Sequence, residues 1–124
     1  MQPQNPQRKL TLEQLRAKHA WDKSKDYQKS HINTAKALPA LIMNSGLMQV
    51  LAFCHDKGEE YKVISDHLRE WLCIRFETLR RAQEFEPFMT TLMHCSPLEY
   101  QQACMEALAW FKWLRLMSAA RKGA

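Results

Sequence analysis

The sequence contains few of the residues from which β-sheets and tight turns are built. Its 124 residues include two valines, four isoleucines and three glycines, against fifteen leucines and thirteen alanines. Valine and isoleucine suit a pleated sheet, whereas alanine and leucine lose little conformational freedom in a helix. The scarcity of β-branched residues and glycine therefore excludes a fold built from β-hairpins and predicts an all-α protein.

Long apolar runs are also missing. No apolar run reaches the roughly 18–20 residues that a membrane-spanning helix needs, and the initial MQPQNPQRK lacks the apolar core of a secretion signal. The four cysteines, at positions 54, 73, 95 and 104, include no CxxC pair. We therefore expect a cytoplasmic protein with no membrane partner, whose cysteines are reduced and serve as small core side chains.

No motif for catalysis or metal binding stands out. The sequence has no Gly-rich phosphate loop and nothing that resembles a nucleophile elbow. The pairs Cys54-His55 and His94-Cys95 are adjacent, whereas structural zinc ligands are usually two to four residues apart. Because neighbouring helical residues point about 100° apart, an adjacent pair is poorly placed to share an ion. We predict no enzyme activity, no catalytic residues, no metal and no cofactor.

The length and composition fit a single globular domain. Hydrophobic residues make up 46% of the chain and charged residues 25%, and domains typically contain about 100–150 residues. Residues 1–10 carry two prolines and four amide side chains and are expected to form a flexible N-terminal tail. Residues 11–124 are expected to form one compact bundle of about five to six helices.

Capping and breaking residues predict where these helices begin and end. Thr11 and Gln14 form a weak capping box ahead of a helix over about residues 12–28. Ser96, Pro97 and Glu99 give a clearer start signal for the final helix. Pro39 is expected to begin a helix or to mark a bend, and helices are expected to stop at Gly46 and near Gly58. The stretch that starts at Glu59 is expected to form one helix or two and to end at Pro87.

Basic residues are in excess and recur on the expected first and last helices. Lys and Arg together number 18 and Asp and Glu 13, which gives a formal net charge of +5. This balance favours a polyanionic partner, and an ordinary solvated face is an equal alternative. Lys9, Arg16 and Lys23 are seven residues apart, and residues at this spacing stay on nearly the same side of a helix. The candidate polyanion-binding face comprises Lys9, Arg16, Lys18, Lys23, Lys25 and Lys29 near the first helix, and Lys112 and Arg115 on the last.

The aromatic residues are assigned to the core and to subunit packing. Trp21 and Tyr27 fall on the apolar face of the first helix and are expected in the core. The final helix carries apolar residues around most of its circumference, so it packs on more than one side. It forms either the centre of the bundle or part of an interface with another subunit. The residues predicted to pack against another subunit are Trp110, Trp113 and Leu116.

Two groups of residues resemble a known family. The sequence carries Arg16-Ala17…Ala20-Trp21, then Tyr27, Ala37-Leu38-Pro39…Ile42…Asn44-Ser45-Gly46-Leu47 and Leu51-Ala52-Phe53, and ends with Tyr100…Glu106-Ala107-Leu108…Trp110…Trp113-Leu114-Arg115…Ala119-Ala120. Both groups, in this order, resemble the small subunit of the Cmr complex, the type III-B CRISPR RNA-silencing effector. They cover about half the chain. Residues 72–86 match no part of that pattern.

The resemblance implies a partner and a role. Small subunits of this family are helical bundles without catalytic residues, and several copies stack in a minor filament beside the backbone subunits. The expected partners are therefore guide RNA, target RNA, other subunits of the Cmr complex and further copies of the chain, with the basic residues above contacting RNA. Three alternatives remain open from the sequence: a small helical DNA-binding regulator, the small subunit of a related type III CRISPR complex, and a protein–protein scaffold whose surface charge is incidental.

Overall fold

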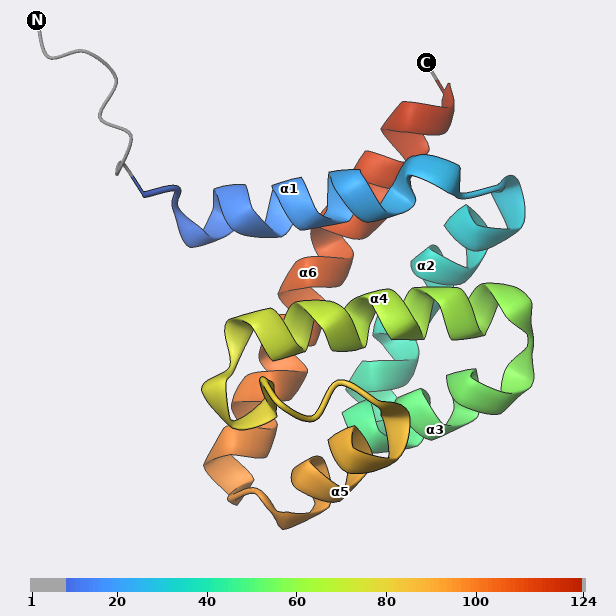
Figure 1. The fold of residues 1–124 in the computed structure, drawn as a ribbon. Coiled ribbons are helices and arrows are strands. Elements are labelled where there is room, and N and C mark those ends of the chain that lie inside the picture. The colour runs from blue at the N-terminus through green and yellow to red at the C-terminus, as the bar shows by residue number, and fades with distance from the viewer. Residues whose placement is uncertain (1–8, 124) are drawn as a thin grey trace, which may run out of the picture.

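Six α-helices and two short 3₁₀ helices make up residues 9–123, the part of the chain that the computed structural model describes (Figure 1). The elements are α1 (Leu12–Lys23), η1 (Ser24–Asp26), α2 (Lys29–Ser45), α3 (Leu47–Lys57), α4 (Glu59–Arg75), η2 (Glu77–Leu79), α5 (Phe85–His94) and α6 (Pro97–Gly123). These residues contain no β-strand, so the predicted all-α class and helix number are confirmed. Residues 1–8 of the predicted tail lie outside the described residues.

The long C-terminal helix α6 is the element around which the others pack. It contacts α1, α2, α3 and α4, and α1 lies across its C-terminal half (Figure 1). Its buried side chains include Ala107, Trp110, Phe111 and Leu114, none of which is more than 1% exposed. The apolar circumference read from the sequence therefore places α6 at the centre of the bundle. None of the helices within residues 9–123 is both long enough and apolar enough to cross a bilayer.

Both predicted capping boxes are present. At α1, the Thr11 hydroxyl accepts a hydrogen bond from the Gln14 N–H (3.1 Å), and the Gln14 side chain accepts one from the Thr11 N–H (2.8 Å). At α6, Ser96 and Glu99 make the same reciprocal pair at 3.1 and 3.0 Å. Each box satisfies two backbone N–H groups that lack a partner in the first turn of a helix.

The first helix is shorter than predicted. It ends at Lys23, and η1 and an extended Tyr27 then turn the chain into α2. The helical spacing of apolar and small residues extends through this turn in the sequence, because Ser24 and Tyr27 of the turn are also buried. A continuous helix and a tight corner therefore give the same pattern in the sequence.

Two prolines lie inside helices. Pro39, predicted to begin a helix or to mark a bend, does not begin one: it lies within α2 and supplies no N–H to the carbonyl of Ala35. Pro87 is the third residue of α5 and does not end the preceding helix. The first-turn N–H groups of a helix have no intrahelical acceptor, so proline is tolerated there. The preceding helix, α4, ends earlier, at Arg75.

Gly46 alone separates α2 from α3, as the predicted stop requires. Its φ of 86° lies in a region that residues with a side chain rarely adopt. A Cβ at this position would lie 2.9 Å from the Tyr100 hydroxyl of α6. That hydroxyl accepts a hydrogen bond from the Met48 N–H at 3.0 Å, in the first turn of α3. The close approach of three helices thus depends on a residue without a side chain.

Replacing Gly46 with alanine is expected to lower the free energy of unfolding by about 2 kcal/mol, because the variant combines a strained φ with a clash against Tyr100. Gly58→Ala is the matched control, because its backbone is extended and a Cβ there meets only Glu60 Oε1 at 3.8 Å. The control should change stability by less than about 0.5 kcal/mol. Urea unfolding of both variants measures the difference, and equal losses would contradict this account.

Candidate nucleic-acid interface

A buried carboxylate joins α1, α4 and α6. The side chain of Glu106 on α6 is 4% exposed. Arg16 of α1 donates to both of its oxygens, from Nε at 2.7 Å and from Nη2 at 2.9 Å. From α4, Trp71 Nε1 donates at 3.0 Å and the Arg75 guanidinium lies 3.3 Å away. Two cations and an indole N–H therefore satisfy one carboxylate.

These contacts keep the carboxylate ionised. Burial alone would raise the pKa of Glu106, but the hydrogen bonds from Arg16 and Trp71 outweigh burial and hold that pKa below its usual value. The same pairing raises the pKa of Arg16. A fork-shaped guanidinium that meets both carboxylate oxygens is among the strongest polar contacts available to a protein. The Arg16 guanidinium is therefore held inside the bundle by Glu106.

A second polar chain runs beside the first. Trp110 Nε1 donates to Nδ1 of His19 at 2.9 Å, so the imidazole proton resides on Nε2, which contacts Glu70 at 2.9 Å. Lys23 Nζ lies 2.8 Å from the same carboxylate. Burial lowers the pKa of His19, partly offset by Glu70. A neutral His19 is what this geometry requires, because a protonated ring would direct N–H at N–H.

The corner between α1 and α2 is built around Tyr27. This residue is 4% exposed, and its hydroxyl lies 2.8 Å from Nδ1 of His67. Its ring is nearly parallel to those of His31 and His67, with centroids 5.1 and 5.7 Å away. Burial raises the pKa of Tyr27 and lowers that of His67 to about 4, so the phenol donates to a neutral imidazole. A depression at this corner is lined in part by Lys23 and Lys25.

The structure divides the eight predicted basic residues into two groups. Arg16 and Lys23 are paired with acids from other helices, and Lys18 is paired with Asp22 at 3.0 Å in its own helix. The prediction of Arg16 as a free surface cation is corrected, because its side chain is 17% exposed and held by Glu106. The members of the eight that are exposed and have no ion pair within residues 9–123 are Lys9, Lys25, Lys29, Lys112 and Arg115.

The three residues predicted to pack against another subunit differ in exposure. Trp110 is fully buried in the core of the chain, which corrects its assignment to an outer surface. Trp113 is half-buried, and its Nε1 donates to Glu13 of α1 at 2.9 Å. Leu116 is 53% exposed. Trp113 and Leu116 therefore retain surface for an interface, and Trp110 does not.

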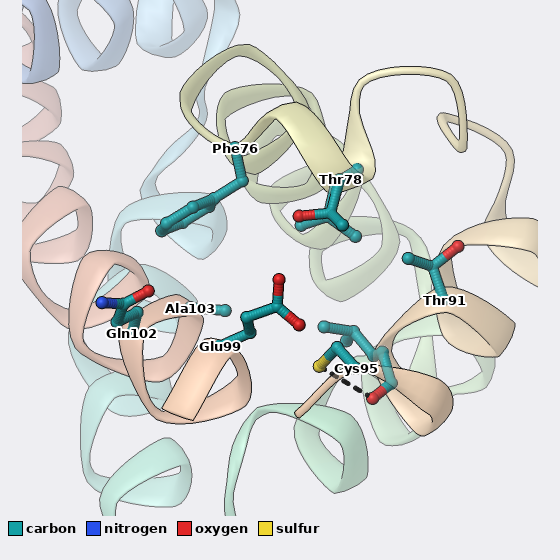
Figure 2. Close-up of a pocket in the computed structure, with 9 residues that line it drawn as sticks. Phe76, Thr78, Thr91, Cys95, Glu99, Gln102 and Ala103 are labelled. Carbon is teal, nitrogen blue, oxygen red and sulfur yellow. Dashed lines mark hydrogen bonds between the residues drawn. The ribbon is translucent and has the colours of Figure 1, made fainter. Parts of the chain in front are cut away.

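A pocket between η2, α5 and α6 contains a thiol and a carboxylate near its centre (Figure 2). The Cys95 thiol donates to the Leu92 carbonyl at 3.2 Å, and burial raises its pKa. Glu99 is held by the Ser96 N–H as part of the helix cap. Both groups thus serve local structure. Within residues 9–123 no three His, Cys, Asp or Glu side chains are grouped as metal ligands would be.

Comparison with known proteins identifies the family. The sequence model of the family described as "CRISPR-associated protein (Cas_Cmr5)" matches residues 12–121. The chain belongs to the Cas_Cmr5 family. It is a small subunit of the type III-B CRISPR complex, Cmr, as the resemblance in the sequence predicted. The matched range includes residues 72–86, for which the sequence alone offered no counterpart.

The fold agrees with this membership. It is similar to the X-ray crystal structure of a CRISPR-associated Cmr5 family protein from Thermus thermophilus, with a TM-score of 0.72. Sequence identity to that protein is 22%, over 90% of this chain and 97% of the other. A comparison with curated proteins gave no significant match. Membership in the Cas_Cmr5 family selects the Cmr subunit over a DNA-binding regulator and over the small subunit of a related complex.

Replacing Glu106 with glutamine is expected to lower the free energy of unfolding by about 3 kcal/mol, because Arg16 then loses its buried counter-charge. Glu77→Gln is the matched control, because the Glu77 side chain is 89% exposed and lies 4.0 Å from Arg80. An exposed pair of this kind contributes less than about 1 kcal/mol. Chemical denaturation of the two variants tests the assignment, which a stability loss of similar size in both would overturn.

Proposed function

We propose that this Cas_Cmr5 protein is a non-catalytic, cytoplasmic RNA-contacting subunit whose exposed cations bind the backbone of guide and target RNA. Family membership supports its place in the Cmr complex. The exposed cations that have no ion pair within residues 9–123 support the contact with RNA. Lys25 and Lys29 flank the α1–α2 corner, and Lys112 and Arg115 are exposed on the half of α6 that α1 crosses. These exposed side chains are the observation that carries the proposal.

The chemistry of these residues suits backbone contact. Lysine and arginine that neutralise phosphates release condensed counterions, which provides affinity without reading sequence. Specificity then resides in base pairing between guide and target, as in other RNA-guided systems. A subunit that contacts only a few phosphates binds weakly by itself, and several copies tethered in a row bind far more tightly.

Neutralising the exposed cations should weaken RNA binding without unfolding the bundle. The test variant carries Lys25→Gln, Lys29→Gln, Lys112→Gln and Arg115→Gln. Its affinity for single-stranded RNA at low salt should fall about ten-fold or more, and the slope of log K against log salt should become less steep by about three. Fluorescence anisotropy at several salt concentrations measures both quantities.

A control variant removes the same charge at other exposed positions, in α2, α3, α4 and the turn after η2. It carries Lys36→Gln, Lys57→Gln, Lys62→Gln and Arg81→Gln, all at exposed positions. This variant should retain most of the affinity and the salt slope of the natural chain. If the two variants weaken RNA binding equally, net charge accounts for the binding and the assigned residues do not.

We also propose that copies of the chain pack through the exposed side of α6 at Trp113 and Leu116. Leu116 is 53% exposed on the same helix as Arg115, so packing and RNA contact would lie on adjacent surfaces. An exposed leucine beside a half-buried tryptophan offers apolar area to a second copy or to another subunit. Filament stacking, the arrangement that the family resemblance implies, requires such a surface.

Introducing a charge at this surface should reduce association of copies. Leu116→Glu is expected to shift the sedimentation profile at high protein concentration toward the monomer by weakening association about ten-fold or more, because an unpaired carboxylate would be buried. Leu98→Glu is the control, because Leu98 is 63% exposed at the other end of α6. Identical sedimentation of the natural chain and Leu116→Glu would remove Leu116 from the interface.

A further inference from the structure

Trp21 lies on the surface, although its spacing in the sequence assigned it to the core. It occupies the last turn of α1, and 42% of it is exposed. The Arg121 guanidinium lies 4.1 Å from the centre of its ring, brought there by the C-terminal turns of α6. An arginine stacked on an indole is held by the electrostatic attraction of a cation for an aromatic face. The pair combines a cation from α6 with an aromatic ring from α1, which neither helix provides alone.

The polar atom of Trp21 is also unused within the described residues. The other three tryptophans all donate their indole N–H inside the chain: Trp71 to Glu106, Trp110 to His19 and Trp113 to Glu13. Trp21 makes no such bond within residues 9–123. The exposed part of Trp21 therefore offers an aromatic surface to a partner.

Cations outnumber acids near Trp21 on α1, η1 and the end of α6, where Asp22 and Asp26 accompany Lys18, Lys23, Lys25, Arg121 and Lys122. Lys18 lies one turn before it, Lys25 lies one turn after it in η1, and Lys122 follows Arg121. Lys18 is paired with Asp22, whereas Lys25 and Lys122 are exposed and have no ion pair within residues 9–123. Proteins hold single-stranded nucleic acid by combining aromatic side chains with cations in this way.

We propose that Trp21 and Arg121 form a stacking site for one unpaired base of single-stranded RNA. This inference rests on the proposed function, because it takes RNA as the partner and adds a contact to a base. The base lies against the indole or the guanidinium, both of which are planar, and Lys25 and Lys122 contact the adjacent phosphates. The excess of cations favours this occupant over a second copy packed through the same surface, which would bring like charge to like charge.

The indole N–H signals of ¹⁵N-labelled protein report directly on the site. The four tryptophans give four such signals, and Trp21→Phe assigns one of them to Trp21. A single-stranded RNA of about eight nucleotides, within the usual range of site sizes, is added at low salt, and the same backbone with abasic positions is added in parallel. The Trp21 signal should shift strongly with the first RNA and weakly with the second, while the three buried or engaged indoles move little.

Affinity measurements separate stacking from charge. Trp21→Ala should lose about ten-fold in affinity for the base-bearing RNA and almost nothing for the abasic RNA, since one base stacked on an aromatic ring contributes about this much. Leu15→Ala is the matched control, because Leu15 is an apolar residue of the same helix with the same 42% exposure. That variant should bind both RNAs like the natural chain.

The opposite results overturn the site in distinct ways. A Trp21 signal that stays in place while backbone signals around Lys25 shift would leave phosphate contact standing and remove stacking. Equal losses for Trp21→Ala and Leu15→Ala would do the same. If Trp21→Ala alters sedimentation and leaves RNA affinity unchanged, the surface belongs to a contact between copies and the stacking site is wrong. An absence of any shift at millimolar RNA would overturn both this inference and the proposed function.

Discussion

The arrangement of the bundle depends on one buried negative charge. A carboxylate removed from water needs several donors, and Glu106 obtains them from α1 and α4 while it is itself part of α6. Because the donors approach from fixed directions, α1 can cross α6 only where Arg16 reaches both oxygens. Apolar packing alone would allow neighbouring helices to slide, whereas a fork-shaped ion pair specifies a single position.

This constraint also decides which cations a partner can reach. The inner side of α1 contributes Arg16 and Lys23 to acids on other helices, so these charges stabilise the fold. Of the eight predicted basic residues, those that are exposed and unpaired within residues 9–123 lie before α1, at the corner and on α6. In this chain, which has a net charge of +5, some basic residues hold helices together and others remain exposed to a partner. Both groups consist of lysine and arginine, so the residue type alone does not tell which basic residues pair within the fold and which remain exposed.

Local signals in the sequence predicted the fold well, and the identity of its contacts poorly. Capping boxes at Thr11 and Ser96 and the stop at Gly46 are decided within a few residues, so their prediction was confirmed. Trp21 was predicted in the core and is exposed, while Trp110 was predicted at an interface and is buried. Both tryptophans lie on apolar faces, and only the partner helix determines which face is covered. Glu106 was not singled out, although a lone acid among the small and aromatic residues of α6 was a usable signal.

The pairing of the first helix with the last has a consequence for synthesis of the chain. Arg16 and Glu106 are 90 residues apart, and His19 and Trp110 are 91 apart. A growing chain emerges N-terminus first, so α1 remains without its counter-charge and its indole partner until nearly all of the protein has been made. Contacts of such long sequence separation also form late, because the intervening chain must first be ordered. The surface proposed to meet RNA therefore exists only on a finished molecule, and a truncated product would lack it.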